Sequence, residues 1–131
     1  MTLHLTERCN LACRYCYQRH GGADMARETA EAAIARLATG NNPGIVFFGG
    51  EPLLRKDLIF GIADWCEARE RGRFHYKVTT NGTLLDEAFL DGAERRRIAV
   101  ALSCDGVRGA HDAGRVDAAG RGTWEIGRAH V

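Results

Sequence analysis

The sequence predicts an α/β fold with parallel strands, and two observations support this class. Four short segments show either strict apolar–polar alternation or an unbroken apolar run, and three longer segments between them repeat apolar residues every three or four positions. Strand and helix therefore alternate along the chain, an order that implies parallel strands joined by right-handed crossovers. With 131 residues, the chain has room for one domain with its own core.

Four segments are expected to form strands, at residues 2–6, 44–48, 74–79 and 98–103. Residues 2–6 alternate apolar and polar side chains, which indicates a strand with one buried face. Residues 44–48 form a continuous apolar run, which is typical of a strand buried on both faces.

Three helices are expected between these strands, at residues 24–38, 57–69 and 86–95. Asp24 is a candidate N-cap of the first helix, and Gly40 lies just past its end. Gly72 should stop the second helix. After the fourth strand the chain is rich in Gly, Ala, Arg and Asp, and we expect only one helical turn there, around His111.

Three cysteines, Cys9, Cys13 and Cys16, follow the first strand with the spacing C-x3-C-x2-C. An iron–sulfur cubane needs four ligands, so three thiolates on one loop leave one iron uncapped. An open coordination position separates catalytic metal sites from structural ones. The alternative is a partial zinc site with His4 or His20 as the fourth ligand, although the paired knuckles or terminal histidines typical of zinc sites are not present in the sequence.

Each of the other three loops that follow a predicted strand carries a motif of its own. Gly49-Gly50-Glu51-Pro52 follows the second strand, and a Gly-Gly pair lets another group approach the backbone closely. Asn81 lies in the loop after the third strand. Ser103-Cys104-Asp105-Gly106 follows the fourth strand, and Arg115 comes shortly after it. Because the carboxyl ends of parallel strands meet at one edge, we expect the four loops to converge on one site.

Together these motifs resemble those of the radical S-adenosylmethionine (SAM) superfamily. The resemblance covers about residues 1–123. The S-x-D-G…H-D-x-x-R…G-x-G-[ST] pattern from Ser103 to Thr123 resembles the subfamily of anaerobic sulfatase-maturing enzymes and related peptide-modifying maturases. It implies the N-terminal part of a partial (βα)6 TIM-like barrel, of which this chain would hold about three and a half βα units. Cys104 and Val107 depart from the usual pattern.

The resemblance also implies the cofactors and their contacts. Cys9, Cys13 and Cys16 would hold a [4Fe–4S] cluster, and SAM would chelate the open iron. The SAM contacts implied by motif position are Tyr15 at the adenine, Gly49, Gly50 and Glu51 at the methionyl ammonium, Asn81 in the pocket wall, and Ser103 with Arg115 at the carboxylate. A planar guanidinium suits a carboxylate well. Cys66 and Cys104 are interpreted as structural.

The chemistry implied by the resemblance is that of an oxidoreductase. The reduced cluster would cleave SAM to a 5′-deoxyadenosyl radical, which removes hydrogen from a protein or peptide residue, as in maturation of a sulfatase cysteine or serine to formylglycine. The electron donor would be a protein such as flavodoxin or ferredoxin. Two alternatives stay open: a maturase of ribosomally made peptides, and a non-catalytic binding module stabilised by zinc or a cluster.

Composition limits the partners and the compartment. The net charge is +1 and the pI about 7.7, so no electrostatic footprint for nucleic acid is visible. No apolar run approaches the ~20 residues that a membrane span needs, and the first residues do not resemble a secretion signal. Five cysteines, an odd number, disfavour a disulfide framework and suit the reducing cytoplasm.

The last seven residues, 125–131, match one reading-frame translation of a common DNA sequencing adapter, so we expect a non-native tail there and a truncated radical SAM core at 1–124. No catalytic base or auxiliary cysteine cluster is expected within such a fragment. We therefore expect the polypeptide alone to bind a cluster weakly and to turn over no substrate.

Overall fold

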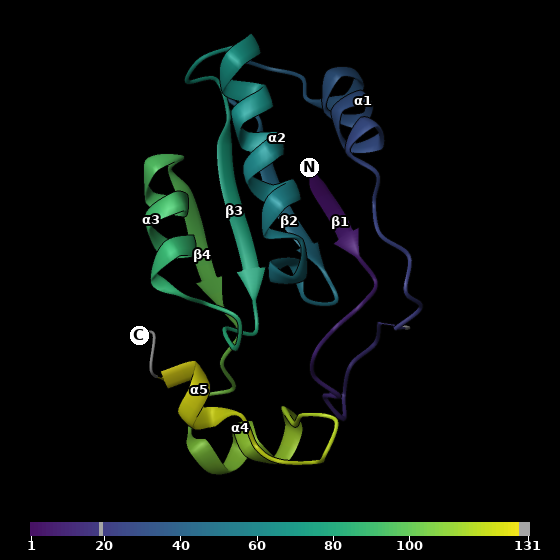
Figure 1. Cartoon of the computed structure of the whole chain (residues 1–131), viewed down its shortest axis with the longest axis vertical. Coiled ribbons are helices and arrows are strands. Elements are labelled where there is room, and N and C mark those ends of the chain that lie inside the picture. Colours follow the sequence, from purple (N-terminus) through teal and green to yellow (C-terminus); the bar gives the residue numbers. More distant parts are fainter. Residues whose placement is uncertain (19, 129–131) are drawn as a thin grey trace.

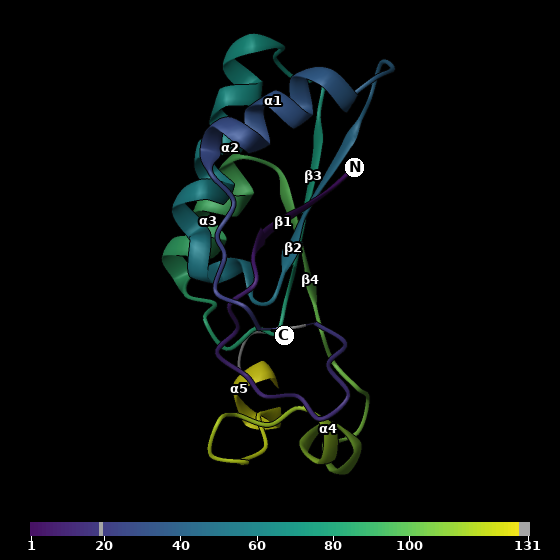
Figure 2. The same cartoon turned by 90° about the vertical axis from the view of Figure 1, so that its right-hand side faces the viewer.

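A four-stranded parallel sheet with helices on one face is the centre of the fold in the computed structural model, which describes residues 1–18 and 20–128 (Figures 1 and 2). The sheet order follows the chain: β1 (Thr2–Thr6), β2 (Gly44–Gly49), β3 (His75–Thr80) and β4 (Ile98–Leu102). All three strand pairs are parallel. The α/β class predicted from the sequence is therefore confirmed.

Three helices connect the strands, and Figure 2 shows them on the same side of the sheet. They are α1 (Arg27–Leu37), α2 (Lys56–Arg69) and α3 (Glu87–Arg95). A short 3-10 turn, η1 (Pro52–Arg55), precedes α2, and two small helices, α4 (Arg108–Gly114) and α5 (Trp124–Arg128), lie beyond the carboxyl ends of the strands.

Burial in the sheet is one-sided because the helices cover a single face. The buried residues of the central strands alternate, as Ile45 and Phe47 in β2 and Tyr76 and Val78 in β3 show. Phe48, on the opposite face, is only partly buried. The expectation that residues 44–48 are buried on both faces is therefore wrong for the part of the chain that the structure describes. We call the side of the sheet away from α1–α3 the open face.

The helix ends differ from the expectation at one informative position. Helix α1 begins at Arg27, and Ala26 precedes it without a side-chain cap. Asp24 does not cap this helix because its carboxylate is bound by other residues. Asp86 caps α3, accepting a hydrogen bond from the amide of Phe89 at 2.7 Å.

The C-terminal region contains more helix than the sequence indicated. Helix α4 includes the single turn expected around His111. Helix α5 begins at Trp124 and enters residues 125–131, which the sequence predicts to be a non-native tail, and Glu125 pairs there with Arg108 at 2.8 Å. Residues 129–131 of that segment lie outside the described residues. In the described part of the chain, no helix is long and apolar enough to cross a bilayer.

The one-sided core predicts different effects for two adjacent phenylalanines. Phe47 is 0% exposed and packs under the helices, so Phe47→Ala should lower the free energy of unfolding by about 3–5 kcal/mol. Phe48→Ala, on the open face, should cost less than half as much. Urea unfolding of both variants measures the difference, and equal losses would show that the open face is packed as tightly as the helix face.

Candidate functional site

The four loops that follow the strands meet at one end of the sheet, together with α4 and α5 (Figure 1). They enclose an open cavity of about 150 Å³. Its lining includes every site residue predicted from the sequence except Glu51: Cys9, Cys13, Cys16, Tyr15, Gly49, Gly50, Asn81, Ser103 and Arg115, together with Tyr17, Gln18, Phe48, Thr79 and Thr80. The structure thus brings residues from four separate loops to one place.

The start of the cysteine loop lies directly against the Gly-Gly motif. The amide of Gly50 donates to the carbonyl of Thr6 at 2.9 Å, and the amide of Glu51 donates to the carbonyl of Arg8 at 2.8 Å. Gly49 has a φ of 136°, and a Cβ atom would lie 2.4 Å from the Thr6 oxygen at Gly49 and 2.2 Å from the Arg8 oxygen at Gly50. Only glycine permits this approach, so the group that the motif admits here is the chain's own backbone.

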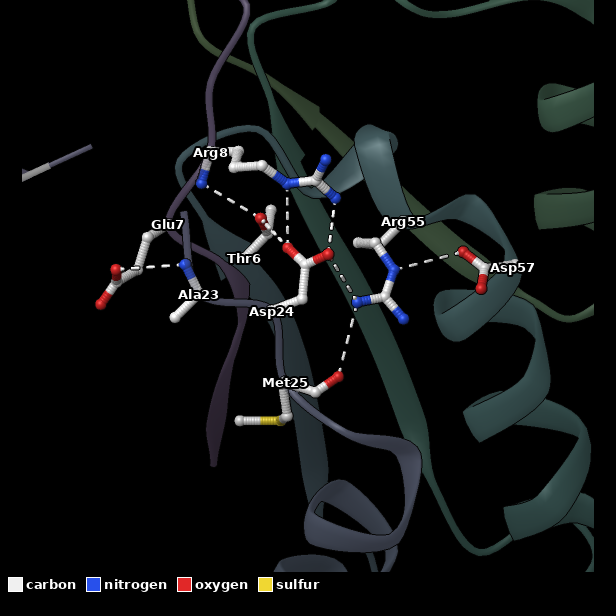
Figure 3. Close-up of polar contacts among 8 residues, drawn as sticks. All are labelled: Thr6, Glu7, Arg8, Ala23, Asp24, Met25, Arg55 and Asp57. Atoms are coloured by element: carbon white, nitrogen blue, oxygen red, sulfur yellow. Dashed lines mark hydrogen bonds and ion pairs between the residues drawn. The ribbon is translucent and has the colours of Figure 1, made fainter. Parts of the chain in front are cut away.

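An ion-pair cluster closes the base of the cysteine loop (Figure 3). Asp24 accepts hydrogen bonds from the hydroxyl of Thr6 at 2.6 Å and from Nη2 of Arg8 at 2.5 Å, and Arg55 Nη1 lies 3.3 Å from its Oδ2. The hydrogen bonds from Thr6 and Arg8 lower the pKa of Asp24 below its ordinary value. The two ends of the loop, before Cys9 and before α1, are thereby tied together and to the residue that precedes α2.

The middle of the loop is held by the end of α4 and the residues just after it. The amide of Ala12 donates to the carbonyl of Val116 at 2.8 Å, and the amide of Arg14 donates to that of Gly114 at 2.9 Å. A Cβ atom at Gly114 would lie 2.5 Å from the ring of Tyr15. Gly114, the last residue of α4, therefore sets the position of Tyr15 through its backbone bond to Arg14 and its contact with the Tyr15 ring.

Asn81 connects the first cysteine to the loop after β3. Its Nδ2 lies 3.0 Å from Asn10 Oδ1 and 3.9 Å from Cys9 Sγ, while its Oδ1 accepts hydrogen bonds from the amide and hydroxyl of Thr83 at 2.9 and 2.7 Å. The amide of Leu11 also donates to Cys9 Sγ at 3.4 Å. Asn81 thus lines the cavity and supports a predicted cluster ligand.

Arg115 and Tyr15 share one carboxylate, that of Asp105. Arg115 Nε donates to Asp105 Oδ1 at 3.0 Å, and the hydroxyl of Tyr15 donates to Oδ2. Burial raises the pKa of Asp105, but the hydrogen bonds from Tyr15 and Arg115 outweigh it and leave the pKa below its ordinary value. Partial burial and the bond to Asp105 raise the pKa of Tyr15 to about 12. Asp105 therefore orients two of the predicted SAM contacts.

Glu51 lies beneath the cavity and is 0% exposed. Its carboxylate accepts hydrogen bonds from the amide of Leu53 at 3.0 Å, the hydroxyl of Thr80 at 2.7 Å and the amide of Asn81 at 2.8 Å. Burial raises its pKa, and these three donors oppose the rise. In this arrangement Glu51 joins the loop after β2 to the loop after β3; its predicted contact with SAM stays a prediction.

The three cysteines of the loop differ in how far they are buried. Cys9 and Cys13 are half-buried, which raises the pKa of both thiols, and Cys16 is exposed. Among residues 1–18 and 20–128, no three His, Cys, Asp or Glu side chains converge enough to hold one metal ion.

The two histidines considered as zinc ligands have different neighbours, a cysteine for one and an aromatic ring for the other. His20 Nε2 is 3.5 Å from Cys16 Sγ, while the ring of His4 packs on Phe48 with ring centres 5.4 Å apart. Of the cysteines interpreted as structural, Cys66 is fully buried, but Cys104 is exposed and has no packing role that burial would indicate.

Two residues of the site were missed by sequence reasoning. Asp105 could have been found, because it lies inside the S-x-D-G motif and ten residues before an arginine. Asp24 could not, because an aspartate three residues before a helix is typical of an N-cap and its partners are distant in sequence.

Comparison with known proteins agrees with this geometry. The sequence profile of the radical SAM superfamily matches residues 3–124. The chain therefore belongs to the radical SAM superfamily, whose members are enzymes that use a [4Fe–4S] cluster and SAM. This membership favours an enzyme over the non-catalytic binding module.

The individual relatives within this superfamily carry the names of different enzymes. The chain is 36% identical over 129 residues to Fe-coproporphyrin III synthase of Methanosarcina barkeri, covering 91% of this chain and 31% of the relative. It is 30% identical over 127 residues to the serine-type anaerobic sulfatase-maturating enzyme of Klebsiella aerogenes, covering 88% of this chain and 31% of that one.

A solved structure of an anaerobic sulfatase-maturating enzyme, with SAM and a peptide bound, superposes with a TM-score of 0.84 at 26% identity, covering 98% of this chain and 37% of that one. The barrel-type fold predicted by the resemblance is confirmed by this likeness. The chain spans about a third of the length of these relatives.

The contact between the Gly-Gly motif and the cysteine loop predicts that Gly50→Ala destabilises the protein. The new Cβ would meet backbone atoms of Glu7 and Arg8, which cannot move without breaking the hydrogen bonds described above, so we expect a loss of about 1–3 kcal/mol in the free energy of unfolding. Gly44→Ala is the control, because no atom lies within 4 Å of its Cβ position. Equal stability of the two variants would contradict the contact.

The lowered pKa of Asp24 predicts that the cysteine loop loosens in acid. A carboxyl whose pKa is lower in the folded state stabilises that state above its unfolded pKa, and the contribution is lost as the pH falls through the folded pKa. Asp24→Asn should reproduce this loosening at neutral pH, as faster amide hydrogen exchange in residues 7–18 and 20–26. Asp57→Asn, which removes a partner of Arg55 but leaves Asp24 intact, should leave exchange unchanged.

Proposed function

We propose that this chain forms the cofactor-binding part of a radical SAM oxidoreductase that acts on a protein or peptide residue. One observation carries the proposal: the three cysteines and the predicted SAM contacts other than Glu51, which come from four loops distant in sequence, line a single cavity at the carboxyl ends of the strands. When bound, cluster and SAM supply reductive cleavage of a SAM carbon–sulfur bond and hydrogen abstraction from the substrate.

The chain's own residues would bind and orient these cofactors. Cys9, Cys13 and Cys16 would hold three irons as thiolates. Arg115, kept in place by Asp105 through Nε, would present its Nη groups to the SAM carboxylate beside Ser103, a bidentate pairing that suits a guanidinium. Tyr15, fixed by Gly114 and Asp105, would lie against the adenine.

The peptide substrate is supported by the likeness to a sulfatase-maturating enzyme with a bound peptide. The maturation of a sulfatase cysteine or serine is the form of this chemistry that we propose first. Maturation of a ribosomally made peptide is the alternative within the same class. The electron donor would be a small reducing protein such as flavodoxin or ferredoxin, and the compartment the cytoplasm.

A second candidate is modification of a tetrapyrrole. It is favoured by one observation, the 36% identity to Fe-coproporphyrin III synthase over nearly the whole chain, which exceeds the 30% identity to the sulfatase-maturating enzyme. The two candidates share the cofactors and differ in the substrate.

Anaerobic reconstitution with iron and sulfide tests the proposal. A protein completed with the downstream part that its longer relatives have should take up about four irons with acid-labile sulfide, and SAM should change the electron paramagnetic resonance spectrum of the reduced cluster because it binds the open iron. Cys9→Ala, Cys13→Ala and Cys16→Ala should each abolish the cluster. Cys104→Ser is the matched control, since this thiol is also exposed but does not line the cavity.

Tight binding of one zinc with no iron, or loss of the cluster in Cys104→Ser but not in the three loop variants, would overturn the proposal. Cleavage of SAM to 5′-deoxyadenosine in the presence of dithionite is the accompanying activity measurement.

A further inference from the structure

We propose that His111 is a positioning residue that holds Arg115 where its guanidinium group can bind the carboxylate of SAM. This inference rests on the proposed function, because it concerns a predicted SAM contact of the same site. It follows from the burial of the imidazole ring, from a closed cycle of hydrogen bonds through it, and from the place of Arg115 in the cavity wall.

His111 is a buried polar side chain that does not itself line the cavity. It lies in α4 and is 2% exposed. The ring of Trp124 packs edge-on against it, with ring centres 5.5 Å apart, and both residues lie within residues 3–124, which the superfamily profile matches. Because a buried polar group costs free energy unless it is hydrogen-bonded, the partners of the two ring nitrogens indicate what this side chain does.

The two ring nitrogens of His111 bind Thr123 and Asp105. Nε2 lies 3.1 Å from Oγ1 of Thr123, which is itself buried, and the Thr123 hydroxyl donates to the carbonyl of Arg115 at 3.0 Å. Because this hydroxyl has a single hydrogen, its oxygen accepts the bond from His111, so the imidazole carries a proton on Nε2. Nδ1 then accepts a hydrogen bond from the amide of Asp105, which at 3.5 Å is the longest of the three.

These bonds hold the backbone of Arg115 at both of its polar groups. The amide of Arg115 donates to the carbonyl of His111 at 2.7 Å, and its carbonyl accepts from Thr123. Its side chain donates through Nε to Asp105 at 3.0 Å, and the amide of Asp105 binds the imidazole. A closed cycle of hydrogen bonds therefore passes through His111, Asp105, Arg115 and Thr123.

The carboxylate of SAM is the ligand group that should respond most to a change at His111. Arg115 lines the cavity beside Ser103 and would meet this carboxylate through its Nη groups, and a guanidinium fixed in advance loses less side-chain freedom on binding. The adenine end depends less on His111, because Tyr15 is also held by contact with Gly114.

Equilibrium binding to the completed, cluster-loaded protein tests the inference with two probes, SAM and decarboxylated SAM. His111→Leu and Thr123→Val should each weaken binding of SAM about 10-fold or more, and binding of decarboxylated SAM less than about 3-fold. His111→Gln, which can place an amide N–H near the position of Nε2, and Thr123→Ser, which keeps the hydroxyl, should bind SAM within about 3-fold of the unaltered protein. Asp112→Asn is the control, because this neighbour of His111 in α4 takes no part in the cycle and should leave both affinities unchanged.

The cofactor-free protein gives a second, spectroscopic measurement. Nitrogen NMR of the histidine rings should show the imidazole of His111 with its proton on Nε2 and none on Nδ1, and the signal is assigned by its loss in His111→Gln. Thr123→Val removes the acceptor of that proton and should change the spectrum of this ring, whereas Asp112→Asn should not. A proton found on Nδ1 would overturn the inference.

Two binding results would also overturn the role of His111 while leaving the proposed function intact. One is unchanged SAM affinity in His111→Leu and Thr123→Val, and the other is an equal loss for SAM and decarboxylated SAM, which a purely structural role would produce. An unaltered completed protein that takes up no iron or binds no SAM would overturn the proposed function and this inference together.

Discussion

The close approach of two backbone segments, the start of the cysteine loop and the Gly-Gly turn after β2, determines the rest of the site. Two hydrogen bonds, from Gly50 to Thr6 and from Glu51 to Arg8, place the loop over the carboxyl end of the sheet. A side chain at either glycine would occupy the same space as a backbone oxygen. The cysteines can lie over the cavity because the second loop lacks Cβ atoms at this point.

Buried or paired carboxylates then stabilise this contact between the two backbone segments and the loop that continues from it. Burying the carboxylate of Glu51 costs free energy unless it is hydrogen-bonded. Its three hydrogen-bond donors come from the loops after β2 and β3, so the burial is tolerated only when both loops are in place. Asp24 ties the two ends of the cysteine loop together and Asp105 acts at its middle through Tyr15, each carboxylate binding an arginine and a hydroxyl. Asp24 and Asp105 in this way hold in place the described part of the segment between β1 and α1, in which the structure has no helix or strand.

The sequence predicted the order of elements and the convergence of motifs, because each motif follows a strand and parallel strands end at one edge. It did not predict which partner each charge takes. Asp24 has the sequence position of an N-cap, and only the fold brings Arg8 and Arg55 beside it. The continuous apolar run of β2 indicated two buried faces, yet helices α1 to α3 cover one. The pattern of apolar residues in a strand indicates which side chains are apolar, and it does not indicate how many faces of the sheet are covered by helices.

The one-sided sheet also explains how alternate residues of one strand serve both the core and the cavity. Residues such as Phe47 and Val78 build the core with the helices, while their neighbours Phe48 and Thr79 form the floor of the cavity. Because side chains alternate along a strand, every change of register by one residue would exchange core and cavity. The strand pairing that stabilises the fold is therefore the same constraint that aligns Phe48 and Thr79 on one face, leading to the cysteines.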